Sequence, residues 1–229
     1  MTITSKLWMG AVLAIASLAV PAGVQARDID QQVAADPGGQ VVVNNVVGTV
    51  NVEAWDKAEV EVTGSIDSGV ERVDVVRDGS RVAVRVVLPT ANSRRDADAD
   101  LTIRVPKGSS LDVTTVSADI TVREVAGALR LKSVSGEIVA HGAAKDSEFK
   151  SVSGDIRVTA AAPAARLVAY SVSGNLVVDD LSGELEATTV SGDLLLDLGT
   201  ITTLRLRSTS GDARVGGRLA KGARVDFES

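Results

Sequence analysis

The sequence predicts an all-β fold, a single-stranded β-solenoid with about 18–20 residues per coil. A motif of the form Ser-Val-Ser-Gly-Asp-Ile recurs, and its third residue falls at positions 117, 135, 153, 173, 191 and 210. Apolar and polar residues alternate with period two on both sides of the motif, which is typical of half-buried strands. A unit with two short strands cannot bury its apolar row alone, whereas stacked units bury it continuously.

Residues 1–26 resemble a secretory signal peptide. Lys6 is a positive residue ahead of an apolar run over 7–20, and Val24 and Ala26 are small residues at the −3 and −1 positions of a cleavage site. An uncleaved anchor is the alternative, but the run is shorter than the roughly 20 residues that span a bilayer. We therefore expect cleavage after Ala26, no stable membrane insertion afterwards, and a periplasmic or secreted protein.

Residues 27–229 are predicted to form one β-solenoid domain whose N-terminal strands are irregular. No Pro-, Gly- or Ser-rich linker divides it. The stretches 40–46, 48–55, 58–62, 70–77, 81–88 and 101–105 alternate or run apolar between turn signals, which indicates strands. The stretch 92–100 is highly charged and is expected to be a surface loop.

Regular coils are predicted from about residue 111. Counting from the motif glycine, apolar residues stand seven, five and two positions before it and two and four positions after it. In one unit these are Leu129, Leu131, Val134, Ile138 and Ala140, and we expect all five to face the interior. Ser147 breaks the pattern, because it occupies a position where the other units have leucine.

The motif itself is predicted to be the corner of each coil. Glycine can adopt a positive φ at a tight bend, and serine and aspartate can hydrogen-bond the backbone groups freed there. The corner glycines are Gly136, Gly154, Gly174, Gly192 and Gly211.

The residue after each corner glycine forms a polar row, mostly acidic. Its members are Asp119 (after Ala118), Glu137, Asp155, Asn175, Asp193 and Asp212. Stacked carboxylates could hold Ca²⁺, which prefers several oxygen ligands. Alternatively, each acid supports its own turn. The nine-residue repeat of calcium-binding β-rolls is absent, and the sequence leaves the choice open.

Two outward-facing rows also follow from the spacing. The first comprises Val139, Arg157, Val177 and Leu195, flanked by Thr121 and Arg214, and its exposed aliphatics predict a partner-binding face. Covering by the N-terminal strands is the alternative. The second row places opposite charges side by side at several steps, which helps register. It comprises Asp112, Arg130, Glu148, Val168, Glu186, Arg205 and Asp226.

Val225 and Phe227 occupy the apolar positions of a further coil. Either this coil leaves a strand edge open, through which the protein could self-associate, or the sequence is truncated.

The chain also resembles a known family. Its segments Gly48-Thr-Val-Asn-Val-Glu-Ala-Trp55 and Leu101-Thr-Ile-Arg-Val-Pro106 and its Val-Ser-Gly-Asp-Ile series are similar to those of the bacterial envelope "putative adhesin" or toastrack domain, over most of residues 38–229. That family has no defined function. The resemblance implies the fold and a link to the cell surface or to envelope-stress signalling, and no functional residues.

Composition excludes several classes of function. The chain has no cysteine, so disulfides, thiolate metal sites and cysteine nucleophiles are absent. A net charge of −6 argues against nucleic-acid binding by phosphate neutralisation. The single histidine, His141, precedes a glycine at an expected turn, where a solvated side chain is the simpler interpretation than catalysis.

The sequence thus predicts a non-enzymatic, exported envelope protein without cofactor, metal or catalytic residues. Its function would be adhesin-like interaction or association with envelope stress, and its partner an envelope protein or a glycan. The alternatives are a carbohydrate-binding or carbohydrate-acting β-helix and a self-associating scaffold.

Overall fold

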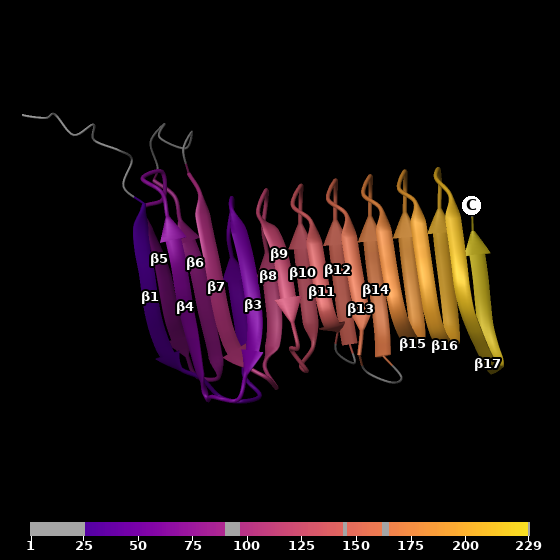
Figure 1. Cartoon of the computed structure of the whole chain (residues 1–229), viewed down its shortest axis with the longest axis horizontal. Coiled ribbons are helices and arrows are strands. Elements are labelled where there is room, and N and C mark those ends of the chain that lie inside the picture. Colours follow the sequence, from indigo (N-terminus) through magenta and orange to yellow (C-terminus); the bar gives the residue numbers. More distant parts are fainter. Residues whose placement is uncertain (1–25, 90–96, 144–145, 162–164, 229) are drawn as a thin grey trace, which may run out of the picture.

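The strands lie side by side along a rod, with the N-terminal strands (indigo) at one end and the C-terminal strand (yellow) at the other (Figure 1). This computed structural model describes residues 26–89, 97–143, 146–161 and 165–228. These residues contain 17 strands and no helix, so no helix in these ranges could cross a membrane. The predicted all-β solenoid is confirmed. The predicted signal peptide lies outside the described residues, apart from Ala26, as does most of the predicted loop at 92–100.

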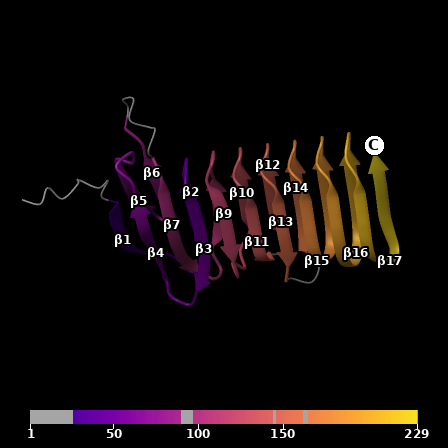
Figure 2. The same cartoon turned by 45° about the horizontal axis from the view of Figure 1, so that its top comes forward.

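Each regular coil contributes one strand to each of two parallel arrays of strands. Coils lie next to one another in both views (Figures 1 and 2). The strands of these coils are β8 (Ser110–Thr114), β9 (Asp119–Arg123), β10 (Leu129–Ser133), β11 (Ile138–Ala143), β12 (Asp146–Ser151), β13 (Ile156–Ala160), β14 (Ala165–Ser171), β15 (Leu176–Thr189), β16 (Leu194–Ser208) and β17 (Ala213–Glu228). In β15, β16 and β17 the strand runs through a bend and serves both arrays.

The register between coils follows the predicted repeat. Leu129 lies opposite both Leu111 and Ser147, and Ile138 lies opposite both Ile120 and Ile156. Equivalent positions of neighbouring units therefore stack, which is the physical winding that the repeat predicts.

The N-terminal strands cap one end of the rod. They are β1 (Arg27–Ala34), β2 (Gln40–Asn44), β3 (Thr49–Trp55), β4 (Glu59–Ile66), β5 (Arg72–Asp78), β6 (Arg81–Val87) and β7 (Ala99–Pro106). β2 lies between β6 and β8, and β3 lies between β7 and β9, so the first coil in sequence is not the first in space. β1 pairs antiparallel with β4, β4 with β7, and β5 with β6. All predicted strands in this half are confirmed within a few residues, and β1 was not predicted.

Most of the predicted interior rows are buried. Leu129, Leu131, Ile138 and Ala140 are all buried in the core, as are their counterparts in the coils on either side. The prediction for Val134 was wrong. This side chain points outward, and Ser133 before it is buried instead.

The alternation of inward and outward side chains along the strand explains the error. Alternation from Leu129 through Leu131 continues to Ser133, so the serine side chain enters the interior. Its Oγ accepts a hydrogen bond of 2.8 Å from the Gly136 backbone N–H, which satisfies a polar group that the corner would otherwise bury unpaired. The same bond recurs from Gly154 to Ser151, from Gly174 to Ser171 and from Gly192 to Thr189.

The reason for the corner glycines also differs from the prediction. Of the five, Gly211 alone has a positive φ. A Cβ atom on Gly136 would lie 2.0 Å from the carbonyl oxygen of Ala118, and one on Gly154 would lie 2.0 Å from that of Gly136. The stacked coils approach so closely at the corner that only a residue without a side chain fits there.

Candidate functional site

A ladder of valines runs along the outside of the corner. We call Val116, Val134, Val152, Val172 and Val190 the valine ridge. The first three are each 44% exposed and the last two are half-buried. Neighbouring members belong to neighbouring coils, because the Ser153 N–H donates to the Val134 carbonyl at 2.8 Å and the Ser173 N–H to the Val152 carbonyl at 2.9 Å. At about 4.8 Å per coil the ridge is roughly 20 Å long.

The backbone of the ridge is already paired. The carbonyls of all five ridge valines accept a hydrogen bond from a serine N–H of the next coil. A partner at this surface would therefore contact side chains, since the corner has no free strand edge to extend. Exposed serines 135, 153, 173 and 191 border the ridge.

The polar row after each corner glycine connects neighbouring coils. Asp119 Oδ1 accepts a hydrogen bond from the Glu137 N–H at 2.8 Å, and Asp155 Oδ1 accepts one from the Asn175 N–H at 2.8 Å. Asn175 and Asp193 make the same bond to the coil that follows each of them. The alternative that each acid supports only its own turn therefore does not hold for these residues, because each bonds the next coil.

These bonds also bear on calcium. One oxygen of each of these side chains is committed to a backbone N–H, and no group of three or more acidic or histidine residues in the described ranges is arranged to hold a metal ion.

The Asp155 bond allows a direct stability test. We expect Asp155→Ala to lower the free energy of unfolding by about 0.5–1.5 kcal/mol, because it removes one partly exposed intercoil hydrogen bond. Asp155→Asn should cost much less, since an amide oxygen serves the same purpose at Asn175. Urea denaturation measures both variants. Equal losses in the two would show that charge, rather than the hydrogen bond, stabilises this corner.

The predicted partner face forms a row across four neighbouring strands, β11, β13, β15 and β16. Val139 lies opposite Arg157, Arg157 opposite Val177, and Val177 opposite Leu195. Leu195 is exposed, while Val139 and Val177 are half-buried. Arg157 forms ion pairs with Glu137 and Asp155, so the aliphatic row is interrupted by a charge that is partly neutralised. The N-terminal strands do not pair with these coils beyond β9.

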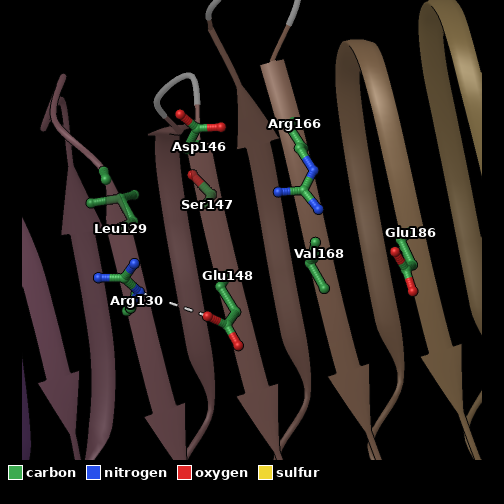
Figure 3. A pocket seen from close by; sticks show the side chains of 9 residues that line it. Leu129, Arg130, Asp146, Ser147, Glu148, Arg166, Val168 and Glu186 are labelled. Carbon is green, nitrogen blue, oxygen red and sulfur yellow. Dashed lines mark ion pairs between the residues drawn. The ribbon is translucent and has the colours of Figure 1, made fainter.

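A polar hollow lies on the other array of strands, over β10, β12, β14 and β15. Its volume is about 590 Å³, and Arg130, Glu148, Val168 and Glu186 form one row across it (Figure 3). The Arg130 guanidinium lies 3.8 Å from the Glu148 carboxylate. These residues belong to the charged row that the sequence placed in register, and their pairing confirms that register.

Glu148 is the titratable group that this hollow perturbs. Its hydrogen bond with Lys150 lowers the pKa of the Glu148 carboxyl from its ordinary value, and the nearby charges of Lys150, Lys132 and Arg130 act in the same direction. A carboxyl with a lowered pKa stays ionised at neutral pH and is poorly suited to act as a general acid.

The lowered pKa predicts a pH-dependent contribution to stability. The ionised form of Glu148 stabilises the fold above the ordinary pKa of 4.5, and this contribution is lost as the pH falls through the lower folded value. The difference in unfolding free energy between the wild type and Glu148→Gln should therefore shrink as the pH falls from 7 to below 4.5. Lys150→Met should remove much of the same pH dependence. A difference that stays constant over this range would contradict the assignment.

The described residues include four aromatic side chains, of which Tyr170 and Phe227 are exposed. Phe149 is fully buried, and none of the residues lining the hollow is aromatic. The Trp55 ring lies under the Lys57 ammonium at 4.4 Å and near the Arg104 guanidinium at 5.9 Å, so its face is occupied by cations. The hollow over β10, β12, β14 and β15 has acids but no aromatic side chain, so it is not the groove of acids and aromatics expected of the carbohydrate-binding alternative.

His141 is exposed, as expected, but it lies in strand β11 and not in a turn. The following residue, Gly142, has φ of 74°, which produces the local irregularity between β11 and β13.

The family model described as Toastrack DUF4097 matches residues 40–229. The chain belongs to the toastrack family. The resemblance inferred from the sequence is thereby confirmed, and this family carries no defined function. No curated protein matches the chain.

Solved structures similar to this toastrack chain share little sequence with it. One is described as a "putative adhesin" from Bacteroides fragilis, with 10% identity, a TM-score of 0.46, and coverage of 89% of this chain and 97% of that one. Another, described as a "putative lipid binding protein" from Parabacteroides distasonis, has 12% identity, a TM-score of 0.42 and coverage of 90% and 97%. A "putative cell adhesion protein" from Clostridium sporogenes has 7% identity, a TM-score of 0.39 and coverage of 89% and 99%.

Proposed function

We propose that this protein is a non-enzymatic interaction module of the bacterial cell envelope, exported to the periplasm or beyond, which binds a protein partner along the corner of its coils. The observation that carries the proposal is the valine ridge. Val116, Val134 and Val152 repeat at one exposed position of three successive coils, whereas isolated apolar residues are the rule on solvated surfaces.

The binding surface extends from the ridge onto the adjacent array of strands. Val139, Val177 and Leu195 each follow a ridge valine by five residues, and the polar row lies between them. We define the corner surface as the valine ridge, the outer row of Val139, Arg157, Val177 and Leu195, and the carboxylates of Glu137, Asp155 and Asp193 between them. It combines aliphatic rows with carboxylates, so the matching partner is a polypeptide surface that presents apolar and basic side chains.

Export is supported by the signal-like pattern in residues 1–26. The first described strand begins at Arg27, directly after the predicted cleavage site. Mass spectrometry of the protein recovered from the bacterial envelope should give Arg27 as the N-terminal residue. An N-terminus at Met1 would contradict cleavage.

The binding proposal is tested by co-sedimentation of purified protein with envelope preparations from the bacterium that encodes it. We expect binding to envelopes, loss of binding after the envelopes are treated with protease, and no binding to protein-free peptidoglycan. The triple variant Val116→Ser, Val134→Ser, Val152→Ser should bind at least about tenfold more weakly, because interface hot spots contribute 2 kcal/mol or more.

A matched control tests whether the corner is specific. The triple variant Val76→Ser, Val168→Ser, Tyr170→Ser removes apolar side chains elsewhere on the rod, and it should bind like the wild type. Equal loss in both variants would indicate general hydrophobic adhesion. Binding that survives protease but requires peptidoglycan would favour the carbohydrate-binding alternative and would contradict the proposal.

A further inference from the structure

The line of the valine ridge continues by one coil toward the N-terminal strands. Val46 stands two residues before Gly48, just as each ridge valine stands two residues before the glycine position of its own corner. The Val46 carbonyl accepts a hydrogen bond of 2.8 Å from the Ser117 N–H, which is the bond that the ridge carbonyls accept in the other coils. The next strand of the array, β6, is not followed by the corner motif, so the line of corners ends at Val46.

A hollow of about 350 Å³, which we call the end pocket, lies at this end of the line, over β2, β6 and β8. Three valines line it, Val46, Val86 and Val116. Two buried polar residues line it as well, and the Asn45 amide and the Thr115 hydroxyl each donate a hydrogen bond to a backbone carbonyl of the chain, at 3.1 and 2.9 Å. An apolar side chain can therefore enter the end pocket without depriving these buried donors of their partners.

The exposed part of the lining carries one positive charge. Arg85 on β6 is exposed and forms no ion pair with a carboxylate of the described residues. The acid opposite it in β5, Asp74, pairs instead with Arg72 at 2.9 Å. Asn44 and Thr114 add an uncharged amide and a hydroxyl to the lining. A carboxylate is therefore the group that this part of the end pocket fits best, because a guanidinium donates charge-assisted hydrogen bonds to it.

The charge at this end is opposite to the charge along the rest of the corner. The polar row beside the ridge is mostly acidic. Glu137 and Asp155 share Arg157, whereas Asp119 and Asp193 form no ion pair with a cation of the described residues. A partner that lies along the ridge would meet carboxylates over most of its length and a guanidinium at one end, so the two possible directions of the partner are not equivalent.

We propose that the end pocket binds an apolar side chain of the envelope partner together with the carboxylate next to it, and thereby fixes the direction in which the partner lies along the ridge. This inference rests on the proposed function, because it concerns the same partner. The matching segment has basic residues opposite the polar row and an apolar residue with a carboxylate at the end pocket. An acidic side chain and a C-terminal carboxyl both supply that carboxylate, and they present the same group to Arg85.

Two substitutions test the end pocket in the co-sedimentation assay with envelopes. Thr114→Trp fills the pocket from an exposed position and should weaken binding at least about tenfold. Arg85→Gln removes the exposed charge and should weaken binding about two- to fivefold. Thr188→Trp, which also stands two residues before a ridge valine, and Arg81→Gln, at the other end of β6, are the matched controls and should bind like the wild type.

Short peptides test the end pocket without the envelope partner. N-acetyl-leucyl-glutamate amide supplies a side-chain carboxylate, and N-acetyl-leucine supplies a terminal one. At millimolar concentration at least one of them should shift the amide NMR signals of Val46, Val86 and Val116, and the one that does so identifies the source of the carboxylate. N-acetyl-leucyl-glutamine amide should shift none of these signals, and Thr114→Trp should abolish the shifts.

The results separate this inference from the proposed function. If the triple serine variant of the ridge loses envelope binding while Thr114→Trp and Arg85→Gln bind like the wild type, the inference is overturned and the proposed function stands. If the wild type binds no envelopes but an acidic compound binds the end pocket, the proposed function is overturned and the pocket remains a site for an apolar carboxylate. No shift with either acidic compound, or equal shifts with the glutamine peptide, would overturn the end pocket itself.

Discussion

Phe149→Ala should lower the free energy of unfolding by about 3–5 kcal/mol. Phe149 is the largest fully buried side chain among the described residues, and it lies in an interior row between Leu131 on one coil and Ala169 on the next. The neighbouring alanine gives the ring its space, so truncation leaves a cavity that no adjacent side chain can fill. Urea denaturation followed by circular dichroism measures the loss.

Phe227→Ala is the control for this prediction. Phe227 belongs to the same row two coils beyond Ala187, opposite Leu206, but it is mostly exposed. Its removal should change the unfolding free energy of the monomer by no more than about 0.5 kcal/mol. Similar losses in the two variants would mean that burial in this row does not determine stability.

Gly154→Ala should cost about 3 kcal/mol or more, which is large for the addition of one methyl group. The new Cβ would lie 2.0 Å from the Gly136 carbonyl oxygen and 2.6 Å from its carbon. Both are backbone atoms, so relief of the clash requires two stacked corners to separate. The corner hydrogen bonds, including that of the Gly154 N–H with Ser151, would be strained at the same time.

Gly38→Ala provides the matched comparison. No atom lies within 4 Å of a Cβ at Gly38, and its φ is not positive. There the substitution should leave stability unchanged or raise it by up to about 1 kcal/mol, because alanine restricts the unfolded chain. Thermal unfolding of the two variants side by side distinguishes close stacking from general glycine flexibility as the reason for the repeated glycines.

The stacking of the coils could be predicted from the sequence because the repeat and the strand alternation agree. Equivalent residues such as Leu167 and Leu185 lie opposite each other as their spacing requires. The order of the N-terminal strands could not be predicted, since β2 and β3 pair with β6 and β7, which follow them in the chain after an antiparallel excursion. Nothing local in the sequence marks that β2 and β3 are enclosed on both sides.

The corner shows where hydrophobicity alone misleads. Val134 is more apolar than Ser133, and the sequence argument placed it inside. The alternation of side chains along the strand places Ser133 inside. Its Oγ accepts a hydrogen bond from the Gly136 N–H, which offsets the cost of burying the hydroxyl. Strict adherence to period two would have identified the valine ridge from the sequence. The glycines show a related limit. A glycine required by close approach between coils and a glycine required by a positive φ look the same in the sequence, because only the stacking distance distinguishes them.

Of the candidate site, the sequence identified the row of Val139, Val177 and Leu195 but missed the ridge beside it. The hollow around Glu148 was visible only as a charged row that keeps register. Its depth depends on the arrangement of side chains across four strands, which the spacing of charges does not contain.

The most direct test of the central claim, that the corner valines stack into a continuous external ridge, is disulfide formation in engineered pairs. The chain has no cysteine, so each pair reports on itself alone. Val134→Cys with Val152→Cys places two thiols on adjacent coils at roughly 5 Å, within the Cα separation that a disulfide allows. We predict that this pair forms an intramolecular disulfide rapidly in the folded protein. Treatment of the folded protein with a bulky maleimide before oxidation should prevent the disulfide. Val134→Cys with Val172→Cys, two coils apart, should form none. If the adjacent pair fails to oxidise, or if maleimide reacts only after unfolding, the ridge does not exist as described.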